Sequence, residues 1–210
     1  MSASPLTTDR FRWDRLTYAS ALGYALLVCA LSVGVVLGEL REQFALSGLV
    51  ASLHGSTFGF GLLAAGLWGV RVVDRLGRRK ALALSATALA SGITLFCTGP
   101  AWPITLTGTA LAGLGGALLV MVMPGLISDH HGEHRAAAFA AVNGAPGLAG
   151  VAFSLIIGLA LALQWSWRAP YLILTGVIVV ALTAVAWPVS IPPSPRQGAF
   201  TLTSFRDRDV

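Results

Sequence analysis

The chain has 210 residues, of which 55% are hydrophobic and only 11% carry a charge. Because a soluble domain carries about a quarter charged residues, this composition excludes an ordinary water-soluble globule and favours a protein of the lipid bilayer. The net charge of +5 does not indicate a nucleic-acid partner, since the Lys and Arg residues form short clusters between apolar segments rather than one basic surface. Cys29 and Cys97 lie inside or at the edge of such segments, and neither supports a disulfide or a metal site.

Six apolar segments follow a polar N-terminal segment, residues 1–16, which lacks the features of a secretory signal. Each apolar segment is long enough to cross a bilayer, so we predict an all-α integral membrane protein with a six-helix transmembrane bundle over residues 17–188. The predicted spans are 17–38, 47–73, 81–98, 104–128, 136–163 and 169–187. Residues 189–210 are predicted to form a cytoplasmic linker or tail.

The distribution of positive charge predicts the orientation of these spans. With six crossings, every Lys and Arg except Arg41 and Arg168 falls on one side, and the positive-inside rule assigns that side to the cytoplasm. Both termini are then cytoplasmic, in a multi-pass protein of the kind found in a bacterial cytoplasmic membrane. Residues 39–42 are predicted to be an outside loop, and residues 164–168 an outer aromatic belt.

The densest run of charge, residues 69–80, lies between the second and third predicted spans. Its cationic side chains and Asp74 cannot lie in hydrocarbon, so the run is predicted to be a short cytoplasmic connection in water. Gly77 suits the turn, because glycine tolerates a positive φ between two helices.

The order Asp74-Arg75-Leu76-Gly77-Arg78-Arg79 resembles the signature loop between the second and third helices of major facilitator superfamily transporters. The family has a glycine four residues before the aspartate, where this chain has Val70, and Gly69 stands one position earlier. The residues that the resemblance assigns to this conformational signature are Gly69, Asp74, Arg75, Gly77, Arg78 and Arg79.

The resemblance extends over nearly the whole chain. Residues 113–116, Gly-Leu-Gly-Gly, are similar to a glycine-rich segment of the family's fourth helix, although the family's arginine is Thr109 here. Trp167 and Arg168 resemble the family's entry to its sixth helix. What the resemblance implies is transmembrane transport of a small solute by alternating access, with no cofactor.

Transporters of that family have two six-helix halves with the solute site between them, whereas this chain resembles the N-terminal half alone. Three explanations stay open: a fragment of a longer reading frame, a half that pairs with a separately encoded half, and a half that forms a homodimer. In each case the expected partners are the lipid bilayer, a small-molecule substrate and a second six-helix half.

Candidate substrate contacts come from polar side chains inside the predicted spans. His54 is the ionisable residue that lies clearly within a span; it could bind substrate, or it could be a neutral side chain that is hydrogen-bonded to a neighbouring helix. In the family, the first and fourth helices line the cavity. The further candidate substrate contacts are therefore Tyr24 and Ser32 in the first span and Thr109 in the fourth, with Asn143 in the fifth. Hydrogen bonds from these side chains to their own helix are the alternative.

Small residues recur at a spacing of four in two of the spans. The pairs are Gly55 with Gly59, Ala112 with Gly116, and Gly113 with Ala117. Such pairs let helices in lipid approach one another closely, and we predict that all three pack inside the bundle.

Two other classes of protein stay open. Residues 129–134, Asp-His-His-Gly-Glu-His, carry metal-ligand side chains, as a membrane-bound metal enzyme would at its cytoplasmic surface. Their spacing matches no helical metal motif and no second cluster in the sequence completes them, so we predict neither an enzyme nor a bound metal. A non-transporting membrane scaffold is the other alternative.

Overall fold

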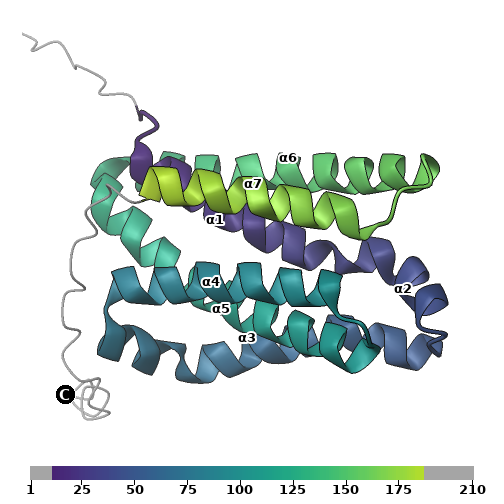
Figure 1. Ribbon diagram of the computed structural model, residues 1–210. Coiled ribbons are helices and arrows are strands. Elements are labelled where there is room, and N and C mark those ends of the chain that lie inside the picture. Colours follow the sequence, from purple (N-terminus) through teal and green to yellow (C-terminus); the bar gives the residue numbers. More distant parts are fainter. Residues whose placement is uncertain (1–10, 187–210) are drawn as a thin grey trace, which may run out of the picture.

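The computed structural model describes residues 11–186 (Figure 1). Residues 1–10 of the predicted N-terminal segment, and the predicted tail, lie outside the described residues. The regular structure of the described part is entirely helical, which confirms the predicted class. In chain order the elements are α1 (Arg15–Leu31), the 3₁₀ segment η1 (Ser32–Val36), α2 (Leu37–Gln43), α3 (Gly48–Leu76), α4 (Arg78–Thr98), α5 (Trp102–His131), the 3₁₀ segment η2 (Gly132–His134), α6 (Arg135–Ala162) and α7 (Arg168–Ala186).

Local side chains set the helix ends. The Asp14 carboxylate accepts a hydrogen bond of 2.8 Å from the backbone N–H of Thr17 and caps α1, and the Ser47 hydroxyl accepts one from Val50 at the start of α3. Both are favoured N-cap residues, because their oxygens satisfy N–H groups without a partner in the first turn. Gly77 separates α3 from α4 with φ +77°, as its position in the sequence predicts.

The helices form two groups that lie side by side (Figure 1). In one group α1 packs against α6 and α7, and in the other α5 packs against α3 and α4. The groups meet where α5 contacts α1 and where α4 contacts α7. Since α5 leads through η2 into α6, this helix also connects the two groups along the chain.

Close glycine contacts hold the second group together. Gly92 of α4 and Gly108 of α5 face one another so closely that a Cβ atom at Gly92 would lie 2.7 Å from the Gly108 carbonyl oxygen. Gly113 and Gly116 also pack inside the bundle, against Phe58 and Leu27, as predicted. The prediction is wrong for Gly55 and Gly59, because no heavy atom of the described residues, apart from the adjoining part of α3 itself, lies within 4 Å of a Cβ built at either position. The spacing alone could not show which face of α3 meets α5.

An aromatic cluster joins the groups at the end of the bundle where α7 begins. The Phe96 ring lies 5.2 Å from that of Trp167 and 5.9 Å from that of Tyr171, and Phe153 of α6 packs edge-on against Tyr171. Trp167 is buried, whereas Trp165 is exposed. The predicted outer aromatic belt is therefore wrong for Trp167, since the turn before α7 directs this ring into the core.

Four helical stretches are long and apolar enough to cross a membrane, Arg15–Gln43, Gly48–Leu76, Arg78–Thr98 and Trp102–Ala162, and α7 adds a shorter apolar helix. The last of the four has 61 residues and turns back at η2. The helices are longer than predicted at their charged ends: residues 39–42, predicted as a loop, belong to α2, and in the predicted connection 69–80 only Gly77 is not helical. A helix forms its own backbone hydrogen bonds both in lipid and in water. It can therefore continue beyond the charged side chains at which the apolar part of the segment ends.

Candidate functional site

Two side-chain contacts join α3 to α5 inside the bundle. The buried His54 places Nε2 2.9 Å from the Thr105 hydroxyl and Nδ1 3.2 Å from the Ala51 carbonyl oxygen. The Thr105 hydroxyl donates its proton to the Trp102 carbonyl oxygen at 2.8 Å, so it accepts at His54 from an imidazole protonated at Nε2. One turn further along, the hydroxyls of Thr57 and Thr109 lie 2.8 Å apart. Two of the predicted site residues, His54 and Thr109, thus belong to one polar seam.

The other predicted site residues are not brought into this seam by any hydrogen bond among the described residues. Ser32 donates to the Val28 carbonyl oxygen and Asn143 to that of Phe139, each within its own helical segment. Tyr24 is buried in α1 as part of the hydrophobic core. For Ser32 and Asn143, the structure thus shows the alternative to solute contact, which is a hydrogen bond from the side chain to the backbone of its own helix.

Sequence reasoning missed several polar groups inside the bundle. The half-buried Thr57 could have been found, because its position three residues after His54 places it on the same helical face. Ser85 of α4 donates to the Gly115 carbonyl oxygen of α5 at 2.8 Å. Ser20, Tyr171 and Thr175 are buried, and within residues 11–186 their hydroxyls have no hydrogen-bond partner. Since buried polar groups are nearly always paired, these three mark positions where a water or a bound molecule would find a partner.

A small cavity lies at the junction of the two helix groups. Its volume is about 10 Å³, and its lining includes Thr109 of α5, Tyr171 of α7 and Phe96 of α4. This space is at the lower limit for a single water molecule, whereas sites for small-molecule ligands measure about 300–1,000 Å³. This cavity cannot hold a solute. A larger hollow of about 230 Å³ lies between α6 and α7, but its lining is apolar, so a site for a polar solute would have to form at another surface of this bundle.

Surfaces that suit such a role lie on α3 and α6, the helices at the two margins of the bundle in Figure 1; together they are called the open face here. On α3 it contains glycines for which the described part of the chain places no heavy atom within 4 Å of a built Cβ: Gly48, Gly55, Gly59 and Gly66. Their separations are close to whole helical turns, so they form one stripe. On α6 the equivalent glycines are Gly144, Gly147 and Gly158, beside the exposed Leu148 and Leu155.

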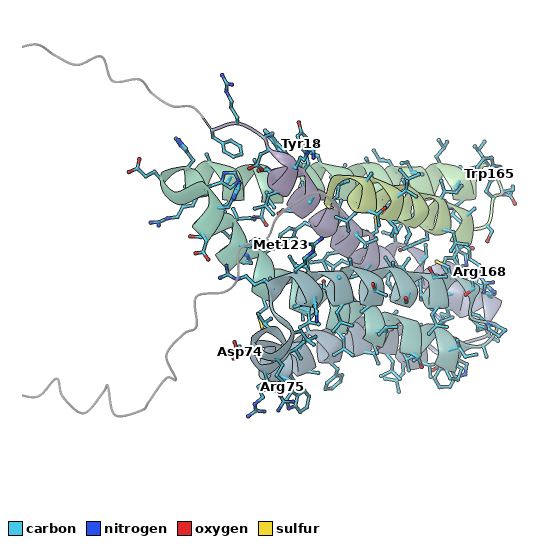
Figure 2. All side chains as sticks on the ribbon, turned by 60° about the vertical axis from the view of Figure 1, so that its left-hand side comes forward. Tyr18, Asp74, Arg75, Met123, Trp165 and Arg168 are labelled. Carbon is cyan, nitrogen blue, oxygen red and sulfur yellow. The ribbon has the colours of Figure 1, made fainter. Side chains whose placement is uncertain are left out.

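The charged residues of the signature loop lie at one end of the bundle. Figure 2 shows Asp74 and Arg75 there, with Trp165 and Arg168 at the opposite end. Asp74, Arg75 and Arg79 are exposed, and no ion pair among the described residues involves them. Arg78 instead turns to α5, where its guanidinium lies 2.6 Å from the Asp129 carboxylate.

Gly69 makes the close helix contact that the family's glycine implies, although it is displaced by one position. A Cβ at Gly69 would lie 2.7 Å from the Met121 sulfur of α5, whereas Val70 is exposed. The signature end of α3 therefore packs against α5 through Gly69.

A second polar cluster lies where α1 begins and α5 ends. The His130 imidazole is 2.6 Å from the Asp14 carboxylate, and the Thr17 hydroxyl lies between Asp14 and His131. Burial alone would raise the pKa of Asp14, but hydrogen bonds from Thr17 and His130 outweigh it and hold this pKa below its ordinary value. Burial lowers the pKa of His131, although the Asp14 charge acts in the opposite direction. Near neutral pH, the cluster thus contains a carboxylate and a neutral imidazole.

Comparison with known proteins identifies the family of this chain. The model of the Major Facilitator Superfamily matches residues 8–207 of this chain. Human solute carrier family 2, facilitated glucose transporter member 6, is 29% identical over 200 residues, which are 92% of this chain and 37% of that protein. The mouse protein of the same name is 28% identical over 92% of this chain and 38% of its own length. This chain therefore spans less than two fifths of the length of these relatives.

Proposed function

Because this chain belongs to the major facilitator superfamily, we propose that it moves a small solute across a membrane by alternating access, as one half of a complete transporter. The observation that carries this proposal is the family match over almost the whole chain. Among the described residues, the cavity where the two helix groups meet measures only about 10 Å³, and the larger hollow of about 230 Å³ between α6 and α7 has an apolar lining. Neither space in the described part of the chain is a polar site of solute size, so a second surface is needed to enclose a polar solute. It is an integral, multi-pass membrane protein, and we place it in the cytoplasmic membrane.

We propose six crossings with both termini in the cytoplasm, residues 1–16 and 189–210 included. The long stretch Trp102–Ala162 then crosses twice and turns at η2, and α7 makes the last crossing. The proposal is supported by the two ends of the described chain, which lie at the same end of the bundle as the connection between α3 and α4 (Figure 1). Arg75 of the signature loop and Arg168 lie at opposite ends of the bundle (Figure 2), in agreement with the positive-inside rule.

The second half packs, in this proposal, against the open face of α3 and α6. Glycines favour close contact between helices in lipid, where association depends on van der Waals packing rather than on the hydrophobic effect. Within residues 11–186, Gly55 and Gly59 have no close contact with a neighbouring helix, which leaves them for a helix of the other half. A second copy of the chain could occupy the same face, and the test below separates the two arrangements.

We propose an uncharged polar solute, and a hexose is the first to test because both named relatives are glucose transporters. The predicted spans contain no carboxylate that could balance a cationic solute. Of the candidate solute contacts, Asn143 is exposed and Ser32 half-buried. Tyr24, His54 and Thr109 are buried, and in this proposal they reach the solute in a conformation that opens the bundle. His54 and Thr109 already lie together in the α3–α5 seam.

Transport in reconstituted vesicles tests the proposal. The chain alone, and the chain co-expressed with the six-helix half encoded downstream or in a separate frame, are reconstituted and compared for uptake of radiolabelled glucose and a panel of neutral solutes. We expect solute uptake by vesicles that contain both halves and no uptake by vesicles that contain this chain alone. If the chain alone takes up solute and chemical cross-linking detects dimers, the transporter is a homodimer of this chain rather than a pair of different halves. A protein that associates with its second half but moves no solute in the panel would favour a scaffold and refute transport.

A further inference from the structure

The cluster at the start of α1 and the end of α5 brings together three metal-ligand side chains. Asp14 precedes α1, while His130 and His131 are consecutive residues in the last turn of α5. His130 Nε2 lies 2.6 Å from Asp14 Oδ2 and His131 Nε2 lies 3.9 Å from Asp14 Oδ1. One ligand atom from each residue lies within 4.8 Å of the other two. The sequence alone did not suggest this group, because Asp14 stands 116 residues before His130.

Neighbouring groups hold these side chains in place. Thr17 donates to Asp14 Oδ1 from its backbone N–H at 2.8 Å and from its hydroxyl at 2.7 Å. The same hydroxyl lies 3.0 Å from His131 Nε2, and the Phe11 ring packs edge-on against the His131 imidazole. The His131 side chain is only 10% exposed. Such supporting contacts fix the ligands of natural metal sites and reduce the cost of assembling them.

The donor set matches zinc better than a hard cation. Two imidazole nitrogens and one carboxylate oxygen are the ligands of many sites that keep the fourth zinc position open, whereas magnesium and calcium prefer oxygen ligands. Metal–ligand bonds of about 2.0–2.1 Å in a tetrahedral site place the ligand atoms roughly 3.3 Å apart. The observed separations, 2.6 Å from Oδ2 to His130 and 3.9 Å from Oδ1 to His131, lie on either side of this value. One ligand atom from each residue lies within 4.8 Å of the others, so side-chain rotations must bring both nitrogens and one carboxylate oxygen to one ion.

We propose that Asp14, His130 and His131 form a zinc-binding site at this end of the bundle, with the fourth position open to solvent. The site does not depend on the proposed transport function. Bound zinc fixes the start of α1 to the end of α5, and these helices belong to different groups of the bundle. Its role is then to hold the two groups together at this end, and no catalytic step is assigned to it.

Zinc titration of the full chain tests the proposal, with the protein purified in detergent through an affinity tag that contains no histidine. Competition with a chromophoric chelator gives the dissociation constant, and Co²⁺ in place of Zn²⁺ gives a visible absorption band when two nitrogens and a carboxylate coordinate it. We expect one saturable site for each chain. His131→Gln and Asp14→Asn should each weaken zinc binding at least roughly tenfold and abolish the cobalt band.

The variants are chosen so that loss of binding does not reflect loss of the fold. Asparagine caps a helix about as well as aspartate but is a poorer zinc ligand, and the side-chain amide introduced by H131Q can still bond to the Thr17 hydroxyl. Asp74→Asn removes a carboxylate far from the cluster and should leave zinc affinity within about threefold. The proposal is wrong if the parent chain shows no saturable zinc binding, or if D14N and H131Q bind zinc as tightly as D74N does.

Discussion

Replacing Gly61 by alanine should destabilise the bundle, whereas the same change at Gly59, two residues earlier in α3, should not. A Cβ at Gly61 would lie 2.6 Å from the Ala110 carbonyl oxygen and 2.7 Å from the Leu114 amide nitrogen, both backbone atoms of α5. At Gly59 no heavy atom in the described part of the chain, apart from the adjoining part of α3 itself, lies within 4 Å. The two variants therefore add the same methyl group to the same helix, once against backbone and once into open space.

The size of the effect follows from these distances. Favourable contacts between heavy atoms lie near 3.5 Å, so α3 has to move away from α5 by roughly 1 Å or the α5 backbone has to deform. Overpacking of this kind costs about 1–3 kcal/mol. Alanine also favours the helix over glycine by up to about 1 kcal/mol, but this gain is common to both variants. We expect G61A to be less stable than G59A by about 1–3 kcal/mol.

Equilibrium unfolding in mixed detergent micelles, followed by circular dichroism, measures the difference between the two variants directly. G59A should unfold at the parent concentration of denaturing detergent or slightly above it, and G61A clearly below it. Equal stability of G61A and G59A would contradict the close α3–α5 contact on which this fold is built.

Three further predictions test the cap, a buried hydrogen bond and the solute contacts. Asp14→Ala should cost about 1 kcal/mol of unfolding free energy and Asp14→Asn only a few tenths, because asparagine keeps the cap; equal losses in micelle unfolding would contradict this role. Ser85→Ala removes the hydrogen bond to the Gly115 carbonyl oxygen. It should lower the free energy of unfolding by about 0.6 kcal/mol, the average for such bonds in membrane bundles. A loss as large as that of G61A would show that Ser85 contributes more than this one hydrogen bond. In the completed transporter, Thr109→Val should raise the KM for the solute about fivefold to tenfold, as the loss of one hydrogen bond implies. Thr107→Val, at an exposed position of the same helix, is its control, and equal KM values for the two variants would remove Thr109 from the site.

The sequence predicted the large features because these depend on composition and local order. Long apolar segments between clustered cations require helices that satisfy their own backbone in lipid, and Gly77 adopts the positive φ that its place between two helices demands. The predicted helix ends were less accurate, since side-chain charge ends the hydrocarbon segment but not the helix.

The candidate site was predicted only in part. His54 and Thr109 could be found as polar residues within spans, and the structure places both in the α3–α5 seam. Ser85 and the buried hydroxyls of Tyr171 and Thr175 were missed, because burial depends on which face of each helix meets its neighbours. Asn143, which was predicted, lies exposed on α6 and bonds to its own helix.

By itself, the sequence determined that this protein is a helical membrane protein and which of its turns carry positive charge, because solvation in lipid or water acts on each segment separately. Only the tertiary structure decided that Gly61 touches another backbone while Gly59 faces open space, and that Asp14 meets two histidines from the far end of α5. Those facts depend on how helices rotate and cross, and the packing of the whole bundle sets these angles.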